Sequence, residues 1–337
     1  MATIKDIARQ ANVSTTTVSR VLNNYPDVSD KTRKKIIRII QENNYRPNTV
    51  ARSLSTSKSN TIGIFFTDHF NTGLHHPFFR EVIYGMEKSL GEKGYDIVYF
   101  TNRHWGENFS YLDKCQDRHV DGVAMMGVLR NDPNLNKLLA SKIPAVFVDI
   151  DIIGKNASYV ISDNISGAKK AINYLYQLGH RKIGMLAGFS TTKTSQERFL
   201  GYQQALKELN LIYNSEWIFD GNYSEEGGYQ AMREMLNLKE LPTGVFCQSD
   251  GMAIGAMRAI EEAGFKVPDD FSLIGFDDIE ASRYVRPALT TVAQNKEKMG
   301  SSIASLLINM IESPNAGNSP IILPVNLIER DSCKKIK

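Results

Sequence analysis

The chain has 337 residues, of which 42% are hydrophobic and 23% charged, and its formal net charge is +3. This composition is typical of a globular protein of two or three domains, and it excludes disordered, collagen-like and disulfide-framework classes. No apolar run reaches the ~18 residues of a membrane helix, and residues 1–11 lack the apolar core of a signal peptide. We therefore expect a cytoplasmic protein with no membrane partner, whose three separated cysteines stay reduced.

The charge is unevenly distributed along the chain. Residues 1–60 carry eleven Lys and Arg against four Asp and Glu, a net charge of +7, whereas residues 61–337 carry 29 basic and 33 acidic residues, a net charge of −4. A small basic module on a mildly acidic body is typical of a protein in which only the module binds a polyanion. Charge counts alone favour a solvated basic face instead, so the pattern inside the module has to decide.

Three short helices are predicted in this module, each after a hydroxyl side chain that can cap it. The caps and expected ranges are Thr3 for residues 4–12, Ser14 for residues 15–23 and Ser29 for residues 30–43. Asp6 completes a capping box with Thr3. In the third helix we place Ile36, Ile37 and Ile40 on the buried side.

The outward face of the second helix carries short polar side chains and an arginine. These residues are Thr15, Thr16, Ser19, Arg20 and Asn23. A helix of this kind, following a three- or four-residue turn, can present its first residues to base edges in the major groove, while backbone N–H groups at helix starts bind phosphates. The sequence therefore predicts a helix-turn-helix module that binds DNA.

A short helical segment follows the module. Pro47 disfavours helical geometry at the preceding residue, and Asn48 can then cap a segment over 49–54 before a polar linker at 55–60. A six-residue helix is unstable alone in water. We therefore expect this segment to fold only against DNA or against its twin in a dimer.

Three motifs cover the module and this segment: residues 3–8 (TIKDIA), 13–23 (VSTTTVSRVLN) and 44–54 (NYRPNTVARSL). Their order and spacing resemble the head-piece of the lactose-repressor (LacI/GalR) family of bacterial transcriptional regulators. The resemblance implies that the second helix enters the major groove and that paired hinge helices of a dimer enter the minor groove at the operator centre. There a leucine is inserted between base pairs and kinks the duplex.

Carried over position by position, the resemblance assigns roles to residues of this chain. The base-reading positions are Thr15, Thr16, Ser19, Arg20 and Asn23, and the phosphate contacts are Ser29 and Thr32. Leu54 falls at the inserted leucine, with Ala51 beside it on the minor-groove face; the alternative for Leu54 is an ordinary linker residue. Thr3, Ser14 and Asn48, at the helix starts, complete the predicted DNA-binding set.

From residue 60 onward, short apolar runs alternate with helical patterns. The expected strands are residues 62–66, 97–100, 120–126, 145–148, 183–186, 244–247 and 272–276, and the expected helices lie near 78–93, 107–118, 132–141, 163–178, 193–210, 224–237 and 249–263. Nearly continuous apolar strands alternating with helices predict parallel sheets covered on both faces. Two such blocks in tandem predict a doubly wound α/β fold with two similar lobes.

Ligands of open α/β sheets bind at the carboxyl ends of the strands, so the polar residues after each apolar run are candidates for a site. They are Thr67 and Asp68, Asp149, Ser249 and Asp250, and Asp277 and Asp278. For any single acid, a helix cap is the stronger alternative. Together they predict a cleft lined with carboxylates and hydroxyls, which suits a neutral polyhydroxylated ligand and repels a nucleotide.

Further motifs run from residue 62 almost to residue 331. They include residues 76–79 (HPFF), 178–183 (LGHRKI), 198–202 (RFLGY), 249–255 (SDGMAIG), 275–278 (GFDD) and 287–292 (PALTTV). These resemble the family's regulatory domain, which implies the two-lobed periplasmic-binding-protein fold with three crossings between lobes. By analogy, the head-piece is 1–47, the hinge and linker 48–60, and the effector-binding and dimerisation domain 61–337. Its N-lobe is about 61–162 with 293–325, and its C-lobe about 163–292 with 326–332.

The resemblance also places an effector pocket. Arg198 falls at the effector-clamping arginine and Asp277 at the sugar-hydroxyl acceptor, and Tyr223 would stack on a sugar, unless it is a surface tyrosine. The full predicted set is Arg198, Asp277, Tyr223, Ser249, Asp149, Gln294, Thr67, His76 and Phe78. The loop 67–76 looks longer than in the lactose repressor. Its adjacent histidines, His75 and His76, lack a third ligand and are more typical of a loop than of a metal site, so we expect no metal and no cofactor.

These features predict a sequence-specific transcriptional regulator, a repressor of carbohydrate-utilisation genes, that binds double-stranded operator DNA under control of a small sugar. An alternative effector is a purine or a protein co-regulator. A dehydrogenase is disfavoured because no G-x-G-x-x-G follows a strand, and a transport binding protein would need a signal peptide and have no use for residues 1–60. Because residues 331–337 carry no leucine heptad, we expect a homodimer rather than a tetramer.

Overall fold

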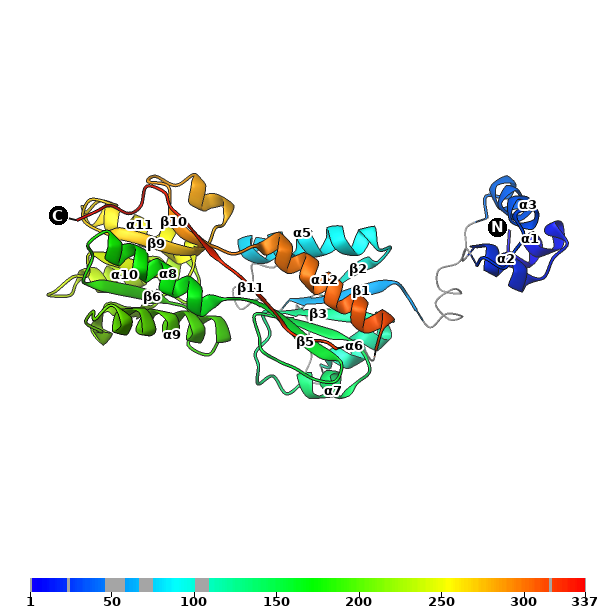
Figure 1. Cartoon of the computed structure of the whole chain (residues 1–337), viewed down its shortest axis with the longest axis horizontal. Helices are drawn as coiled ribbons and strands as arrows, with labels where there is room; N and C mark the ends of the chain where they lie inside the picture. Colours follow the sequence, from blue (N-terminus) through cyan, green and yellow to red (C-terminus); the bar gives the residue numbers. More distant parts are fainter. Residues whose placement is uncertain are drawn as a thin grey trace. The chain divides into compact units, whose positions relative to one another are not determined.

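The computed structural model describes residues 2–22, 25–45, 58–66, 75–100, 109–314 and 317–336. The chain forms two compact units, Met1–Ser59 and Asn60–Lys337, which can be followed from blue to red in Figure 1. No helix among these residues is long and apolar enough to cross a membrane.

The first unit consists of three helices whose starts are fixed by the predicted caps. They are α1 (Ile4–Ala11), α2 (Thr15–Leu22) and α3 (Asp30–Glu42). Thr3 Oγ1 accepts a hydrogen bond from the amide of Asp6 at 3.4 Å, and the Asp6 carboxylate accepts one from the amide of Thr3 at 2.9 Å, which completes the capping box. Ser14 Oγ accepts from the amide of Thr17 at 3.1 Å, and Ser29 Oγ from that of Thr32 at 3.4 Å.

A small core holds these helices together, and one predicted core residue is wrong. The buried side chains are Ile7, Ala8, Ala11, Val18, Val21 and Ile36. Ile37 is 42% exposed, whereas Ile39 and Ile40 pack against the core. The reason is geometric: residues three and four positions after Ile36 share its face of the helix, and the next residue lies about 100° around the axis.

The second unit contains two six-stranded sheets. The first has the order β11 (Ile321–Leu323), β5 (Ala157–Ser162), β4 (Ala145–Val148), β3 (Gly122–Met126), β1 (Thr61–Phe66), β2 (Asp96–Phe100), with every pair parallel. The second has the order β12 (Asn326–Ile328), β10 (Thr290–Ala293), β9 (Ser272–Asp277), β8 (Gly244–Cys247), β6 (Ile183–Ala187), β7 (Ile218–Asp220), with only β10 and β12 antiparallel.

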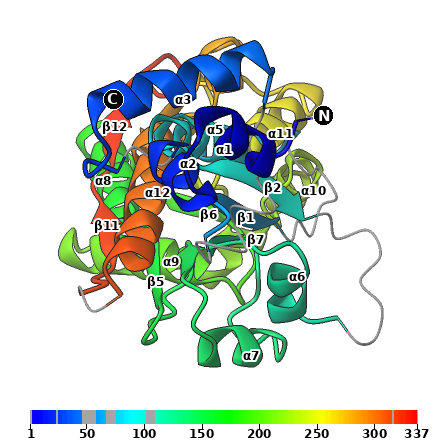
Figure 2. The ribbon, with the colours of Figure 1, turned by 90° about the vertical axis from the view of Figure 1, so that its right-hand side faces the viewer.

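Helices cover both faces of each sheet, as the apolar strands require. On the first sheet α5 (Pro77–Glu92) and α12 (Lys296–Glu312) pack on one face, and α6 (Tyr111–Asp117) and α7 (Leu135–Ala140) on the other (Figure 2). On the second, α8 (Asn164–Gln177) and α9 (Lys193–Glu208) oppose α10 (Glu225–Leu236) and α11 (Asp250–Glu262). The predicted fold class, a helical head-piece followed by two parallel-sheet α/β lobes, is confirmed.

Close approach of α5 and α12 depends on two glycines. A Cβ atom at Gly85 would lie 2.3 Å from the carbonyl oxygen of Glu297, and one at Gly300 would lie 2.1 Å from that of Val82. The two backbones therefore touch where these helices cross, and α12, which follows the second sheet in the chain, is fixed on the first.

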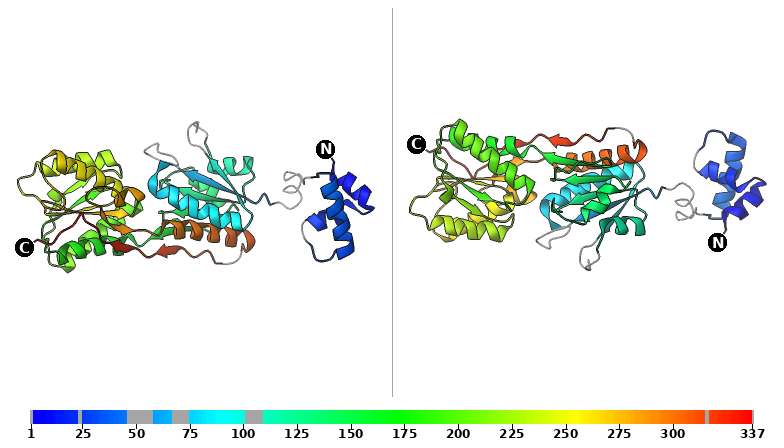
Figure 3. Two further views of the ribbon diagram at one scale, coloured as in Figure 1. Left: turned by 90° about the horizontal axis from the view of Figure 1, so that it is seen from above. Right: turned by 90° about the horizontal axis from the view of Figure 1, so that it is seen from below.

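The chain passes between the two sheets three times, after β5, after β10 and after β11. Figure 3 shows the last of these connections as the red segment that runs from one lobe to the other. The sequence did not predict β5, β7, β10, β11, β12 or α12. The strands that these connections join lie at one edge of each sheet, β11 and β5 in the first and β12 and β10 in the second.

Candidate functional site

The outer face of α2 in the first unit carries the predicted base-reading residues. Thr15 and Thr16 are exposed, Ser19 is partly exposed, and the Arg20 side chain is 52% exposed. Arg20 donates a hydrogen bond to Asp27 Oδ2 at 2.7 Å. This pairing uses one nitrogen of the guanidinium and leaves the arginine on the exposed side of the unit.

Side chains at the start of α3 form a local contact and a contact with the end of α2. The hydroxyls of Ser29 and Thr32 lie 2.9 Å apart at the start of α3. The guanidinium of Arg33 donates to the backbone carbonyls of Val21 and Tyr25, at the end of α2 and in the following loop. From the sequence, Arg33 counts only as positive charge, so this positioning role was not predicted. Asn23, Asn48, Ala51 and Leu54 lie outside the described residues.

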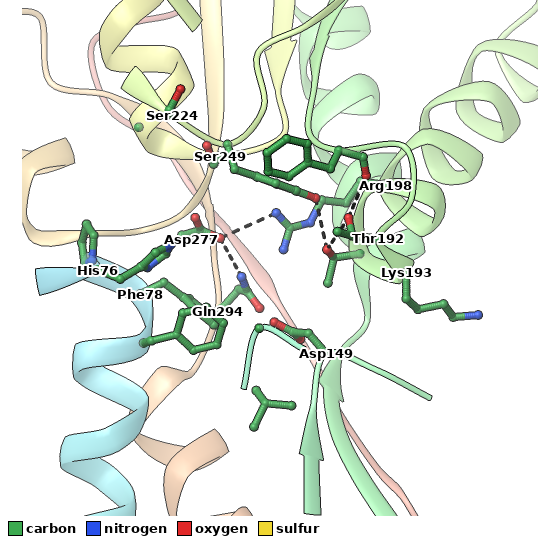
Figure 4. A pocket seen from close by; sticks show the side chains of 18 of the residues that line it. His76, Phe78, Asp149, Thr192, Lys193, Arg198, Ser224, Ser249, Asp277 and Gln294 are labelled. Carbon is green, nitrogen blue, oxygen red and sulfur yellow. Dashed lines mark hydrogen bonds and ion pairs between the residues drawn. The ribbon is translucent and has the colours of Figure 1, made fainter. Parts of the chain in front are cut away.

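The second unit contains a cavity of about 610 Å³ whose walls come from both lobes (Figure 4). Its polar lining includes Asp149, Thr192, Arg198, Ser249, Asp277 and Gln294, and its apolar lining includes Phe66, Phe78, Phe79, Phe189, Tyr223 and Ile279. A concave, mostly apolar site with a few convergent polar groups is typical of a small-molecule pocket.

Arg198, from α9, is buried with 3% of its surface exposed, and its guanidinium is held from several directions. Nε donates to Asn164 Oδ1 at 2.8 Å, and Nη1 donates to the backbone carbonyl of Gln248. The guanidinium carbon lies 3.7 Å from the centre of the Phe276 ring, a cation–π contact. The arginine is therefore fixed in orientation before any ligand binds.

Asp277 lies opposite Arg198 at the end of β9. Its Oδ1 is 3.7 Å from Nη1 of Arg198 and accepts a hydrogen bond from Gln294 Nε2 at 2.6 Å (Figure 4). Burial raises the pKa of Asp277, and the neighbouring Arg198 charge opposes that rise. The backbone at Asp277 has a φ of 117°, and Asp278 follows with 53°. Non-glycine residues in such conformations are strained, and such strain concentrates at functional sites.

Asp149 extends into the same cavity from the end of β4. Its Oδ1 is buried and has no hydrogen-bond partner among the described residues, as is also true of Oε1 of Gln294. Burial raises the pKa of Asp149 to about 7, although the charge of Arg198 acts in the opposite direction. Two buried acceptor oxygens are thus available for a ligand that brings hydrogen-bond donors.

Tyr223 forms part of the apolar wall and is half-buried rather than a surface tyrosine. Its hydroxyl lies 3.1 Å from Thr194 Oγ1, and its ring packs so closely on the backbone of Gly188 that a Cβ there would lie 2.1 Å from it. Ser249 also reaches the cavity, but its Oγ accepts from the amide of Met252 at 3.3 Å and so caps α11. Ser249 is therefore the N-cap of α11 and also lines the cavity.

His76 and Phe78, at the start of α5, line the cavity on the side of the first sheet. His76 packs edge-on against Phe66 and Phe79. No group of three or more His, Cys, Asp or Glu within the described ranges could hold a metal ion. Thr67, Asp68 and the rest of the loop before His75 fall outside those ranges.

Two of the carboxylates that follow strands do not line the cavity. Asp250 is buried and accepts hydrogen bonds from the amide of Ile279, at 2.8 Å, and from the hydroxyl of Thr291. Asp278 pairs with Arg330 and Arg283. Both side chains join segments of the second lobe, so each has a structural role at this edge.

Charged side chains at the edge of the cavity connect the two lobes. Asp151, which follows β4, lies 2.6 Å from Arg130 and 3.2 Å from Lys193 at the start of α9. Lys193 is also 3.3 Å from Glu197. Lys193 and Arg130 line the cavity, and sequence analysis singled out neither.

A helix-turn-helix unit joined to a two-lobed α/β unit with a cavity between its lobes is the architecture of a DNA-binding regulator. The comparisons with known proteins agree: residues 3–48 match the model of bacterial regulatory proteins of the lacI family, and residues 172–333 match the periplasmic binding protein-like domain. The chain belongs to the LacI family of transcriptional regulators, as the sequence motifs predicted, and it is a DNA-binding repressor rather than an enzyme.

Relatives match the chain over its whole length. It is 36% identical to the HTH-type transcriptional repressor PurR of Mannheimia succiniciproducens and 36% identical to the ribose operon repressor of Haemophilus influenzae, with both chains fully covered in each case. It is 38% identical to the probable HTH-type transcriptional repressor ExuR of Bacillus subtilis, covering 100% of this chain and 99% of that one. Membership in this family agrees with the predicted cytoplasmic location.

Solved structures show the same similarity. The lac repressor dimer bound to operator and an anti-inducer has a TM-score of 0.81 and 27% identity, with 99% of each chain covered. The complex of the regulator CelR with cellobiose has a TM-score of 0.76 and 30% identity, covering 98% of this chain and 100% of that one.

Proposed function

We propose that the chain is a homodimeric repressor whose binding to a pseudo-palindromic operator is controlled by a sugar bound in the cleft. The observation that carries the sugar assignment is the buried acceptor pair, Asp149 Oδ1 and Gln294 Oε1, facing the cavity near the fixed guanidinium of Arg198. Vicinal hydroxyls can donate to the carboxylate and amide oxygens while accepting from the arginine. The aromatic side chains of the wall suit the apolar face of a sugar ring.

In this proposal the first units of two protomers bind adjacent major grooves. Thr15, Thr16, Ser19, Arg20 and Asn23 contact base edges, and Thr3, Ser14, Ser29 and Thr32 lie at phosphates. Asn48, Ala51 and Leu54 act in the hinge segment, with Leu54 inserted at the operator centre. The exposure of Thr15, Thr16 and Arg20 on α2 supports this assignment.

The regulatory step follows from the marginal stability of the hinge. Effector binding moves the lobes relative to each other, and the change separates the two hinge segments so that they unfold. Because a six-residue helix has little stability alone, a small change in lobe geometry can shift operator affinity by the ~1–3 kcal/mol of an allosteric coupling. The names of the ribose operon repressor and of the CelR–cellobiose complex support a sugar as effector, and the lac repressor dimer supports the homodimer.

A second candidate effector is a purine. The observation in its favour is the number of aromatic side chains in the cavity, among them Phe78, Phe189 and Tyr223, which can stack on a planar base. The PurR relative adds weight to it. A protein co-regulator is the remaining alternative if no small molecule binds.

The proposed effector class can be tested by thermal unfolding in the presence of ribose, glucose, galactose, cellobiose and lactose, with adenine, guanine and hypoxanthine beside them. A ligand that binds only the folded protein raises the melting temperature in proportion to the logarithm of its concentration above Kd. We expect at least one sugar to do so and Arg198→Ala to remove the shift. A shift with a purine alone would transfer the assignment to the second candidate.

The dimer is tested separately by sedimentation velocity of the full chain at micromolar concentration. A single dimeric species is expected. A stable monomer or tetramer would contradict the proposal.

A further inference from the structure

Lys296, the first residue of α12, is a buried cation that joins the two lobes beside the cleft. Only 5% of its surface is exposed. Its ammonium donates to the backbone carbonyl oxygens of Asp277 and Asp278, both at 2.7 Å, and lies 3.5 Å from Glu81 Oε2. A buried ammonium is tolerated only when its charge and donors are compensated, and here two carbonyl acceptors and an ion pair with Glu81 do so.

The two carbonyl oxygens belong to the strained turn at the end of β9. Asp277 and Asp278 have φ values of 117° and 53°, which are backbone conformations that non-glycine residues rarely adopt. Lys296 binds the carbonyl oxygens of both residues, while the Asp277 carboxylate faces the cavity toward Arg198 and Gln294. Lys296, which does not line the cavity, therefore fixes the position of that carboxylate through the backbone that carries it.

The ion-pair partner of Lys296, Glu81, lies on the other lobe from the Asp277 turn. Glu81 is in α5, which packs with α12 on the first sheet, and the first turn of α5 carries His76 and Phe78 into the cavity. One ammonium thus contacts the turn that bears Asp277 and the helix that forms the opposite wall. A ligand that moves either wall changes the hydrogen bonds of Lys296.

We propose that Lys296 is the positioning residue of the cleft and that, with Glu81, it transmits the position of the Asp277 turn to α5 of the other lobe. The inference rests on the proposed function in that the cleft is taken as the effector site. It assigns separate consequences to the two residues. Lys296 sets the affinity of the cleft for its ligand, and Glu81 sets how far ligand binding reaches the DNA-binding unit.

The test uses the full chain and has one arm that needs no effector. Hydrogen exchange is measured on Lys296→Met, with Lys298→Met as the matched control, because Lys298 is an exposed residue two positions along α12. Protection of peptides covering 276–282 should fall about tenfold or more in Lys296→Met, partly recover in Lys296→Arg, and stay at the wild-type level in the control. Equal protection in Lys296→Met and Lys298→Met would overturn the positioning role.

The second arm uses the sugar that gives the largest thermal shift and an operator selected in vitro with the wild-type chain. Glu81→Gln should keep the sugar Kd within about threefold, but reduce the sugar-induced change in operator Kd by about tenfold. Glu87→Gln, an exposed carboxylate on the same helix, is the control. A sugar-induced change in operator Kd equal to that of the wild type in Glu81→Gln would overturn the coupling role. A purely structural effect of the substitution is distinguished from coupling because it would lower stability without reducing the sugar-induced change in operator Kd at an unchanged sugar Kd. If no sugar binds the wild type, the proposed sugar function fails, while the exchange arm still decides the role of Lys296.

Discussion

Arg198 and Asp277 form a buried ion pair in which Nη1 lies 3.7 Å from Oδ1, and the two side chains are only 4% and 13% exposed. This separation exceeds the 2.7–3.2 Å of an N–H···O hydrogen bond. The two charges attract each other, but each group keeps hydrogen-bonding capacity for a ligand. A ligand hydroxyl can accept from the arginine and donate to the carboxylate at once, which neither residue alone permits.

The first prediction concerns Arg198. Arg198→Lys keeps the charge but loses the planar fork that contacts Asn164, Gln248 and Asp277. We expect a sugar affinity about 10–100-fold weaker, corresponding to about 1.4–2.7 kcal/mol, and unchanged operator binding without sugar. Arg198→Ala should abolish the sugar response. Calorimetric titration measures the sugar affinity of the two Arg198 variants, with Lys207→Ala on the exposed face of α9 as control. Sugar-induced release of operator by Arg198→Ala at the wild-type level would refute the assignment.

The second prediction is a pH dependence of stability that originates at Asp149. Its pKa is raised from 3.8 to about 7 in the folded protein, mainly by burial. The folded state therefore binds the proton more tightly than the unfolded state, so the free energy of unfolding falls as pH rises through this range and levels off above about 7. At about 1.36 kcal/mol per pKa unit, the loss between pH 5 and pH 8 is about 2–3 kcal/mol.

Urea unfolding of the wild type and of Asp149→Asn at several pH values isolates this contribution. Arg198, Asp277 and Glu197 also act on the carboxyl, but they are present in both proteins. The difference in unfolding free energy should change with pH in the stated direction. Parallel curves for the two proteins would show that Asp149 titrates near its ordinary pKa.

The third prediction concerns the ion pair between Asp151 and Lys193, which joins the lobes at the edge of the cavity. Their side chains are 22% and 32% exposed, so the pair is partly shielded from solvent. A double-mutant cycle with Asp151→Asn and Lys193→Gln should give a coupling of about 0.5–1 kcal/mol in unfolding free energy, decreasing with added salt. Asp151→Asn should also weaken sugar binding, because Arg130 and Lys193 lose their shared counter-ion. Strict additivity of the two substitutions would contradict the interaction.

Sequence reasoning located the cleft through one rule, that ligands lie at the carboxyl ends of parallel strands. Asp149, Ser249 and Asp277 are there because each follows a strand whose apolar run is plain in the sequence. The rule could not separate Asp277 from Asp278. Their opposite roles depend on the turn after β9 and on a partner, Arg330, that lies 52 residues further along the chain.

Several of the strands that were not predicted from the sequence are very short. The strands β7, β11 and β12 have three residues each and β10 has four, too short for periodicity to show. Lys296 begins a helix that returns to the first sheet after a crossing. Its two carbonyl acceptors and its ion-pair partner come from two other segments of the chain, so its role could be known only from the structure.

The fourth prediction concerns Leu54, which lies outside the described residues and whose role follows from the family resemblance. If Leu54 is inserted into the operator centre, Leu54→Ala removes the apolar wedge and should weaken specific binding by about 1–3 kcal/mol, while nonspecific binding changes little. Fluorescence anisotropy with selected operator and with random duplex gives the comparison. An equal loss on both duplexes would return Leu54 to the role of a linker residue.

The fifth prediction joins the charge distribution to the two sites. Residues 1–60 carry a net charge of +7 and the remainder −4, so operator binding should release counterions, whereas ligand binding in the cleft should not. The logarithm of operator affinity should fall linearly with the logarithm of salt concentration, with a slope of about −0.9 per phosphate neutralised.

Sugar affinity should change by less than about twofold between 50 and 200 mM salt, because Arg198 and Asp277 are buried and already compensate each other's charge within the cavity. Anisotropy titrations and calorimetry on the same full-length preparation measure the two dependences. Comparable salt dependences of operator affinity and sugar affinity would indicate that the ligand in the cleft carries a net charge. A neutral sugar would then be excluded as the effector.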